Sequence, residues 1–133
     1  MAILPSPIPK PTVLVVDDDE NVRRVLCRVL DFHGFQPVEA TTLSEVTNDT
    51  LPHLDAVLLD LHLAKGESGI TVLEWLRTQP RYRDTPIMVL TGEAVVSEHD
   101  EESIRRHRAY VYFKGQTLQP LMEHLKRLVA KHP

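Results

Sequence analysis

Cysteine, long apolar runs and an excess of positive charge are what this sequence lacks. Cys27 is the single cysteine among 133 residues, which excludes an internal disulfide and is typical of a reducing compartment. The longest apolar runs are four or five residues, whereas a membrane-spanning helix needs about 20. The proline-rich start, residues 1–11, lacks the layout of a secretion signal. We therefore expect an extended lead-in and a cytoplasmic protein.

The charge balance limits the classes of partner. A formal net charge of -4 gives no general attraction to nucleic acid, so direct nucleic-acid binding is not expected. Because the apolar runs are short, no membrane partner is expected either. The basic residues at 105–108 follow an acidic stretch at 98–102. This arrangement is typical either of a solvated helix laced with ion pairs or of a patch that binds a partner.

Apolar segments alternate with segments of helical periodicity, which predicts one domain of the α/β class. Strands are expected at 13–16, 35–40, 55–60, 86–91 and 110–114, and helices at about 22–30, 43–48, 69–78, 97–108 and 118–129. Pro37 cannot donate a ladder hydrogen bond, so the second strand belongs at a sheet edge. Right-handed crossovers then favour a flavodoxin-like, doubly wound, five-stranded parallel sheet of order 2-1-3-4-5, with helices on both faces.

Polar residues end the central strands of this predicted sheet. Asp60 closes an apolar run, and a buried carboxylate is costly unless a cation can reach it. In the predicted topology the strand ends meet at one rim, and the residues gathered there are Asp17, Asp18, Asp60, Thr91 and Lys114. Carboxylates this close repel one another unless a cation lies among them. Magnesium fits best, with manganese as a substitute.

Each of these residues also has a purely structural explanation. The acidic run that starts at Asp17 is suited to capping a helix. Thr91 could bond to the backbone, and Lys114 could be a surface cation. Because the residues arrive together at the ends of four expected strands, a shared site is the better interpretation.

The sequence resembles the receiver domain (CheY-like) of bacterial two-component response regulators over residues 12–130, and we expect one such domain over 12–133. The resemblance implies that Asp60 is the phosphoacceptor for a sensor histidine kinase or a histidine phosphotransfer protein. The magnesium ligands that it implies are Asp18 directly, Asp17 through water, Asp60, and the backbone carbonyl of His62. Asp60 would attack the phosphorus of phosphohistidine, while the domain supplies positioning and electrostatics.

The resemblance also assigns the residues that respond to the phosphoryl group. Thr91 matches a hydroxyl that moves to the phosphoryl group, Lys114 matches the cation that pairs with it, and Gly92 leaves the site open. The helix expected at 97–108 has Ile104 as its one clear apolar anchor, so it should be the least firmly packed. We expect a switch of protein contacts rather than an enzyme, with a downstream protein target or a homodimer through the helix 4, strand 5 and helix 5 face.

Three positions depart from the family pattern. Gly115 follows Lys114 where the family usually has proline in a cis peptide; a cis bond before glycine costs about 2.5 to 4 kcal/mol, so a trans or differently shaped loop is expected. Val111 replaces an aromatic switch residue, and Tyr110 and Tyr112 beside it should point elsewhere. The stretch DLHLAKGESG is one residue wider than the commonest spacing.

Two alternatives remain open. A pseudo-receiver would bind partners without phosphorylation, as Gly115 and Val111 suggest. A phosphohydrolase of the haloacid dehalogenase type also uses a strand-end aspartate, but it needs a second aspartate where this chain has His62. Because the sequence stops after the last expected helix, we expect no DNA-binding or catalytic output domain, in either a stand-alone receiver or a piece of a larger regulator.

Overall fold

Five parallel strands form the centre of the computed structural model, which describes residues 9–48, 50–92 and 96–131. The strands are β1 (Thr12–Val16), β2 (Gln36–Ala40), β3 (Ala56–Asp60), β4 (Ile87–Thr91) and β5 (Tyr110–Phe113). Their order across the sheet is β2-β1-β3-β4-β5, and every neighbouring pair is parallel. The predicted order is confirmed, and Pro37 lies in the edge strand β2.

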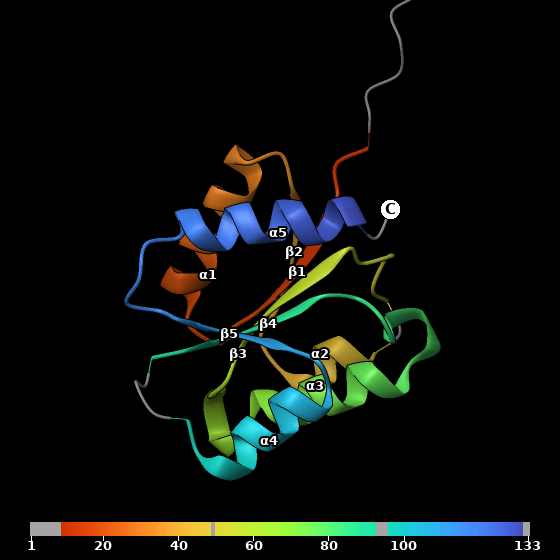
Figure 1. Ribbon diagram of the computed structural model, residues 1–133, viewed down its shortest axis with the longest axis vertical. Helices are drawn as coiled ribbons and strands as arrows, with labels where there is room; N and C mark the ends of the chain where they lie inside the picture. Colours follow the sequence, from red (N-terminus) through yellow and green to blue (C-terminus); the bar gives the residue numbers. More distant parts are fainter. Residues whose placement is uncertain (1–8, 49, 93–95, 132–133) are drawn as a thin grey trace, which may run out of the picture.

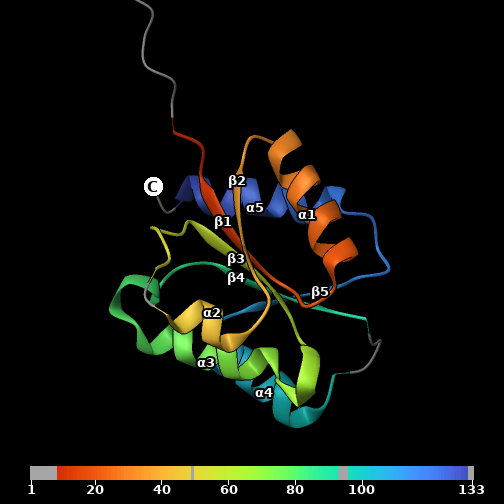
Figure 2. The same cartoon turned by 180° about the vertical axis from the view of Figure 1, so that it is seen from behind.

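Helices cover both faces of the sheet, as Figure 1 and, from behind, Figure 2 show. The helices α1 (Glu20–Phe32) and α5 (Gln119–Lys131) lie on one face, and α2 (Leu43–Thr47), α3 (Gly69–Thr78) and α4 (Glu98–Arg106) lie on the other. Short 3-10 turns, Ala64–Gly66 and Pro80–Tyr82, flank α3. This is the flavodoxin-like doubly wound arrangement that the sequence predicts.

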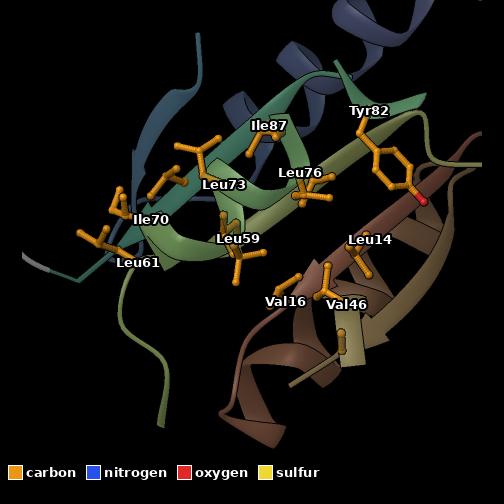
Figure 3. Close-up of a cluster of buried hydrophobic side chains, with 14 of the residues drawn as sticks. Leu14, Val16, Val46, Leu59, Leu61, Ile70, Leu73, Leu76, Tyr82 and Ile87 are labelled. Atoms are coloured by element: carbon orange, nitrogen blue, oxygen red, sulfur yellow. The ribbon is translucent and has the colours of Figure 1, made fainter. Parts of the chain in front are cut away.

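Two apolar clusters hold the sheet between the helix layers. Leu14 and Leu59 belong to the cluster beneath α2, α3 and α4, and Figure 3 shows them with Leu73 of α3. Val15 and Leu58, one residue away on the same strands, belong to the cluster beneath α1 and α5. A one-residue slip of a strand would turn each of its side chains to the opposite face of the sheet, away from the cluster in which it packs. The register is therefore well specified, and it fixes which residues emerge at the carboxyl rim.

Helix α1 begins directly after the acidic segment because Asp19 caps it. Its Oδ1 accepts hydrogen bonds from the N–H groups of Asn21 at 2.8 Å and Val22 at 3.1 Å, an arrangement that contributes about 1 kcal/mol. Gly34, at φ 88°, follows the C-terminus of the helix in the left-handed region that glycine favours. Since Asp19 supplies the cap, the carboxylate of Asp17 is left for another role.

Helix α4 is held mainly at its C-terminal end. Ile104 is its one buried residue among those that the structure describes, as predicted. The Arg77 side chain donates from Nε to the His107 carbonyl oxygen at 2.8 Å, just beyond the end of the helix. Its second nitrogen, Nη1, donates to the carbonyl oxygens of Tyr82 and Thr85, each at 2.8 Å. This arginine ties α4 to the connection between α3 and β4.

Helix α3 has the predicted bounds, 69–78, whereas most other elements begin or end one or two residues away from the predicted positions. The residues predicted in strands that lie just outside them are Phe35, Asp55, Pro86 and Lys114. Asp55 accepts the N–H of Thr12 with its side-chain Oδ2 at 2.8 Å. Helix α4 is shorter than 97–108 because Ser97 is its N-cap and Arg108 adopts φ 56°. The helices predicted at 22–30, 43–48 and 118–129 are Glu20–Phe32, Leu43–Thr47 and Gln119–Lys131.

The expected lead-in, residues 1–11, lies mostly outside the described residues, so the division at residue 12 stays a prediction. Within the described residues, no helix combines the length and apolar character needed to cross a membrane.

Candidate functional site

The carboxyl ends of β1 and β3 bring three aspartates together. Carboxylate oxygens of Asp17, Asp18 and Asp60 all lie within 4.8 Å of one another. Asp17 and Asp60 are buried, whereas Asp18 is exposed to solvent. The sheet order makes this cluster, because β1 and β3 are hydrogen-bonded neighbours. The acidic cluster predicted from the sequence is therefore present.

Lys114 reaches this cluster from the turn after β5. Its Nζ lies 3.0 Å from Oδ1 of Asp60 and 3.3 Å from Oδ2 of Asp17. Its backbone N–H donates to the carbonyl oxygen of Thr91 at 2.8 Å, which fixes the turn to the end of β4. One ammonium group thus faces two buried carboxylates, and the site keeps an excess of negative charge.

Burial sets the ionisation of the two central groups. Burial raises the pKa of Asp60, and the nearby charge of Asp17 raises it further, although the hydrogen bond from Lys114 opposes both effects. For Lys114, burial acts to lower the pKa, but the hydrogen bond with Asp60 and the charges of Asp17 and Asp60 outweigh it, so the pKa is raised. The ammonium is therefore firmly charged, while the Asp60 carboxylate lacks sufficient compensation.

One buried oxygen indicates what is needed to balance the cluster. Oδ2 of Asp17 has no partner with hydrogen-bond geometry among the described residues, and its contact at 3.3 Å with Nζ of Lys114 is an ion pair. The other oxygen, Oδ1, accepts the N–H of Asp19 at 2.9 Å. An unsatisfied carboxylate oxygen in an all-oxygen cluster suits a hard divalent cation such as magnesium. The residues present therefore fit that ion.

Thr91 and Gly92 end β4 beside the cluster. Leu90 is the register partner of Asp60, so Thr91 lies one position beyond the acid on the neighbouring strand, where it is fully buried. A Cβ added to Gly92 would meet no atom of the described residues beyond its chain neighbours within 4 Å, so local packing does not demand glycine there. Both residues lie at the predicted rim, and their roles remain predictions.

His62 lies in the loop that follows the acid. Its N–H donates to Oδ1 of Asp60 at 3.3 Å, and it forms an isolated antiparallel bridge with Ser68. The loop between Asp60 and Gly69, which is one residue longer than the commonest spacing, contains a 3-10 turn in which Lys65 and Gly66 have φ of 60° and 75°. The loop places His62 next to the acid, and the ligand role of its backbone carbonyl remains a prediction.

The departures at the end of β5 have clear structural consequences. No cis peptide occurs in residues 9–48, 50–92 and 96–131, so the bond before Gly115 is trans, and Lys114 still reaches the acids. Val111 is partly exposed at the sheet edge. The Tyr112 hydroxyl forms a 2.6 Å hydrogen bond with Nδ1 of His124, and the Tyr110 ring packs edge-on against the same imidazole. Both rings thus contact His124 of α5, in agreement with the expectation that they point away from the switch position.

Sequence reasoning missed the packing role of Gly69. A Cβ on this residue would collide with the backbone carbonyl oxygen of Asp60. Its N–H donates to the carbonyl oxygen of Leu61 at 2.7 Å, which brings the start of α3 directly under the end of β3. The only signal in the sequence was a glycine nine positions after the acid, at the start of an apolar periodic segment.

The fold and the site define a doubly wound α/β domain with an acidic rim, suited to a cation, at the carboxyl ends of its strands. The chain belongs to the response regulator receiver domain family, which it matches over residues 13–126. It is therefore a receiver domain of the two-component response regulators. The phosphate regulon transcriptional regulatory protein PhoB of Escherichia coli (strain K12) is 36% identical over 94 residues, covering 70% of this chain and 39% of PhoB. The match thus spans about two fifths of PhoB's own length.

Solved structures show the same fold. The CheY-like response regulator receiver domain protein from Methanospirillum hungatei JF-1 gives a TM-score of 0.80 at 21% identity, covering 92% of this chain and 96% of that one. The receiver domain of sensor histidine kinase PA1611 from Pseudomonas aeruginosa PAO1 gives 0.77 at 22% identity, covering 92% and 99%. That structure has a magnesium ion coordinated in its active-site cleft.

Proposed function

We propose that this receiver domain accepts a phosphoryl group on Asp60 from a sensor histidine kinase or a histidine phosphotransfer protein. The observation that carries the proposal is a buried carboxylate at a strand end, 3.0 Å from the ammonium of Lys114, in a cluster with Asp17 and Asp18. Such a cluster of like charges has little structural benefit unless a further cation balances it.

The chemistry needs one nucleophile and several fixed charges. A carboxylate oxygen of Asp60 attacks the phosphorus of phosphohistidine, the phosphorus–nitrogen bond breaks, and its electron pair leaves with the imidazole. Magnesium, or manganese in its place, would neutralise phosphoryl oxygens when held by Asp17, Asp18, Asp60 and the backbone carbonyl of His62. Lys114, whose Nζ lies 3.0 Å from Oδ1 of Asp60, would stabilise the charge on the phosphoryl oxygens. The magnesium in the PA1611 receiver supports this choice of ion.

The response to phosphorylation would begin at Thr91. The acyl phosphate adds about 1.5 to 2 negative charges, and the Thr91 hydroxyl would turn toward it beside the open Gly92. The segment that follows leads into α4, whose one buried anchor is Ile104 among the described residues. A beryllofluoride mimic should change amide hydrogen exchange across 93–112, of which 93–95 lie outside the described residues, more than across 22–30. Equal change in both segments would favour a domain that signals by charge alone.

A groove beside the site suits the protein that donates the phosphoryl group. It has a volume of about 310 Å³ and is mainly apolar; its lining includes Lys114 and the apolar residues Val22, Val25, Leu26, Leu118 and Leu121. Any protein that presents a histidine to Asp60 must approach this rim, so its helices would lie against α1 and the turn before α5. The apolar lining then supplies the contact area that a small phosphodonor does not need.

A second copy of the chain is a further proposed partner. The large apolar side chains exposed on the edge strand β5 are Tyr110, Val111 and Phe113. The first turn of α4 is acidic, whereas α5 carries Lys126, Arg127 and Lys131. A two-fold pairing across β5 would set the acidic turn of one copy against the basic helix of the other. Light scattering with beryllofluoride should show a dimer that Arg127→Glu weakens.

An interaction module that works without phosphorylation is the second candidate. The exposed Val111 favours it, because this position carries no aromatic ring that could turn inward when Thr91 moves. A phosphohydrolase activity is not favoured, because His62 stands where that chemistry needs a second aspartate. PhoB is a transcriptional regulatory protein, so our proposal that there is no direct nucleic-acid binding concerns the receiver domain alone. For this domain we propose a cytoplasmic location and a downstream protein target.

Acetyl phosphate or phosphoramidate tests the proposal directly. With magnesium present, intact mass should show the addition of one phosphoryl group to the wild-type chain and none to Asp60→Asn. Asp55→Asn is the matched control, since Asp55 lies just before the opposite end of β3, where its side chain accepts the N–H of Thr12; this variant should gain one phosphoryl group like the wild type. Full labelling of Asp60→Asn would refute the assignment.

A further inference from the structure

Arg23 binds the backbone of the segment that carries Asp17 and Asp18, and the phosphoryl chemistry described above gives this arginine no role. Its guanidinium Nη1 donates to the carbonyl oxygen of Asp17 at 3.0 Å. Its Nε donates to Oε1 of Glu39, on the edge strand β2, at 3.1 Å. The side chain is only 15% exposed although it extends from the first turns of α1. Arg23 thus bridges β2 and the chain immediately after β1.

The acceptor in this bridge is the carbonyl of the peptide that joins Asp17 to Asp18. A peptide unit is planar, so holding its oxygen fixes the orientation of the whole unit and the direction in which Asp18 leaves it. Asp17 is further held by its N–H, which donates to the Ala40 carbonyl oxygen at 3.2 Å, and by Oδ1, which accepts from Asp19 at 2.9 Å. With these contacts made, Oδ2 of Asp17 is left facing the cluster.

We propose that Arg23 is a positioning residue for the divalent cation at Asp17, Asp18 and Asp60. It holds the Asp17–Asp18 peptide so that both carboxylates converge on the ion. The inference rests on the cation site of the proposed function. It adds to that site a residue that contacts the backbone of Asp17 instead of the ion, so that a positively charged side chain strengthens the binding of another cation.

That opposition of signs makes the proposal testable. As a bare positive charge, Arg23 would weaken the binding of a divalent cation, and its removal would tighten binding. As a positioning residue, its removal loosens the ligand set and weakens binding. Residues that orient metal ligands typically change affinity by about 10- to 100-fold, which exceeds the effect of one partly screened charge.

Arg24 provides the matched control. It is the next residue on α1 and carries the same charge, but it is exposed and pairs with Glu20 at 3.0 Å. The magnesium dissociation constant is measured by amide NMR shifts during titration with magnesium chloride. Arg23→Gln should raise it about tenfold, whereas Arg24→Gln should leave it within about twofold. Arg23→Lys keeps the charge but cannot reach both acceptors with a planar fork, so it too should bind magnesium more weakly.

A purely structural role predicts a different pattern. It would lower the melting temperature and the fraction of folded protein without moving the magnesium midpoint, and phosphorylation at saturating magnesium would fall with that fraction. Under our proposal the midpoint moves and the rate at saturating magnesium recovers. If Arg23→Gln does not fold, Arg23→Lys carries the test, because a charge-only role leaves its affinity at the wild-type value.

The proposal is overturned if Arg23→Gln binds magnesium as tightly as the wild type or more tightly, or if Arg23→Lys retains wild-type affinity. None of these titrations involves phosphorylation. A wild-type domain that binds magnesium in an Arg23-dependent way but accepts no phosphoryl group would refute the proposed function and leave this inference standing. A domain that is phosphorylated while Arg23→Gln binds magnesium normally would refute this inference alone.

Discussion

Replacing Arg77 by methionine should destabilise the domain and loosen α4. The side chain makes three hydrogen bonds of 2.8 Å to the carbonyl oxygens of Tyr82, Thr85 and His107. A hydrogen bond with one charged partner contributes about 1.5 to 3 kcal/mol, but these three are not additive, because two share one nitrogen. Burial also lowers the pKa of Arg77, with Arg108 adding to the effect, so desolvation offsets part of the gain.

We expect Arg77→Met to lower the free energy of unfolding by about 2 to 3 kcal/mol. For a domain of this size each kcal/mol corresponds to about 3 to 5 °C in melting temperature. Arg83→Met is the control, since Arg83 is an exposed arginine in the connection between α3 and β4 that Arg77 contacts. Arg83→Met should change the free energy of unfolding by less than about 0.5 kcal/mol.

The assay combines urea unfolding with amide hydrogen exchange. In Arg77→Met, amides of α4 should exchange faster relative to those of α1, because the tie at His107 is lost. If Arg77→Met and Arg83→Met unfold at the same urea concentration and exchange alike, the three hydrogen bonds do not hold α4 and the reasoning is refuted.

Four further predictions concern the site. Asp18→Ala should remove most magnesium affinity in an NMR titration; unchanged affinity would place the ion elsewhere. Gly69→Ala should lower stability to urea by about 1 to 3 kcal/mol, because its Cβ meets the Asp60 carbonyl; wild-type stability would contradict this. Val25→Glu, at a side chain 53% exposed in the groove, should slow phosphotransfer from a protein donor but not from acetyl phosphate, and equal slowing would count against the docking surface. Because burial raises the pKa of Asp60, its ionisation costs stability as pH rises through the folded-state pKa, so Asp60→Asn should raise the melting temperature of magnesium-free protein near neutral pH and lose that advantage in acid. The same difference at both pH values would oppose this ionisation argument.

The sheet and its rim could be predicted because they depend on patterns that are local in the sequence. Apolar runs in β1, β3 and β4 are almost wholly buried, and each ends in a polar residue, so the topology alone brings Asp17, Asp60 and Thr91 together. Lys114 follows from the same logic, although the missing proline concealed that the trans turn still directs its ammonium to the acids.

Contacts made by long side chains could not be predicted. Arg23 contacts the carbonyl oxygen of Asp17, six residues earlier, and a glutamate on the edge strand β2. Arg77 contacts the carbonyl oxygen of His107, 30 residues later. Several arginines in the sequence have the same local surroundings, and nothing in their spacing distinguishes the buried ones from the solvated ones. Gly69 was likewise hidden, because its close approach to Asp60 depends on the path of the whole intervening loop.

The central claim is that the phosphoryl group resides on Asp60, and chemical trapping locates it. Borohydride reduces an acyl phosphate to an alcohol, so treatment of the domain after incubation with acetyl phosphate and magnesium converts the modified aspartate to homoserine. Fragment masses should place homoserine at position 60 and leave Asp17 and Asp18 intact. Homoserine at either of those positions, or none anywhere in a phosphorylated chain, would contradict the account.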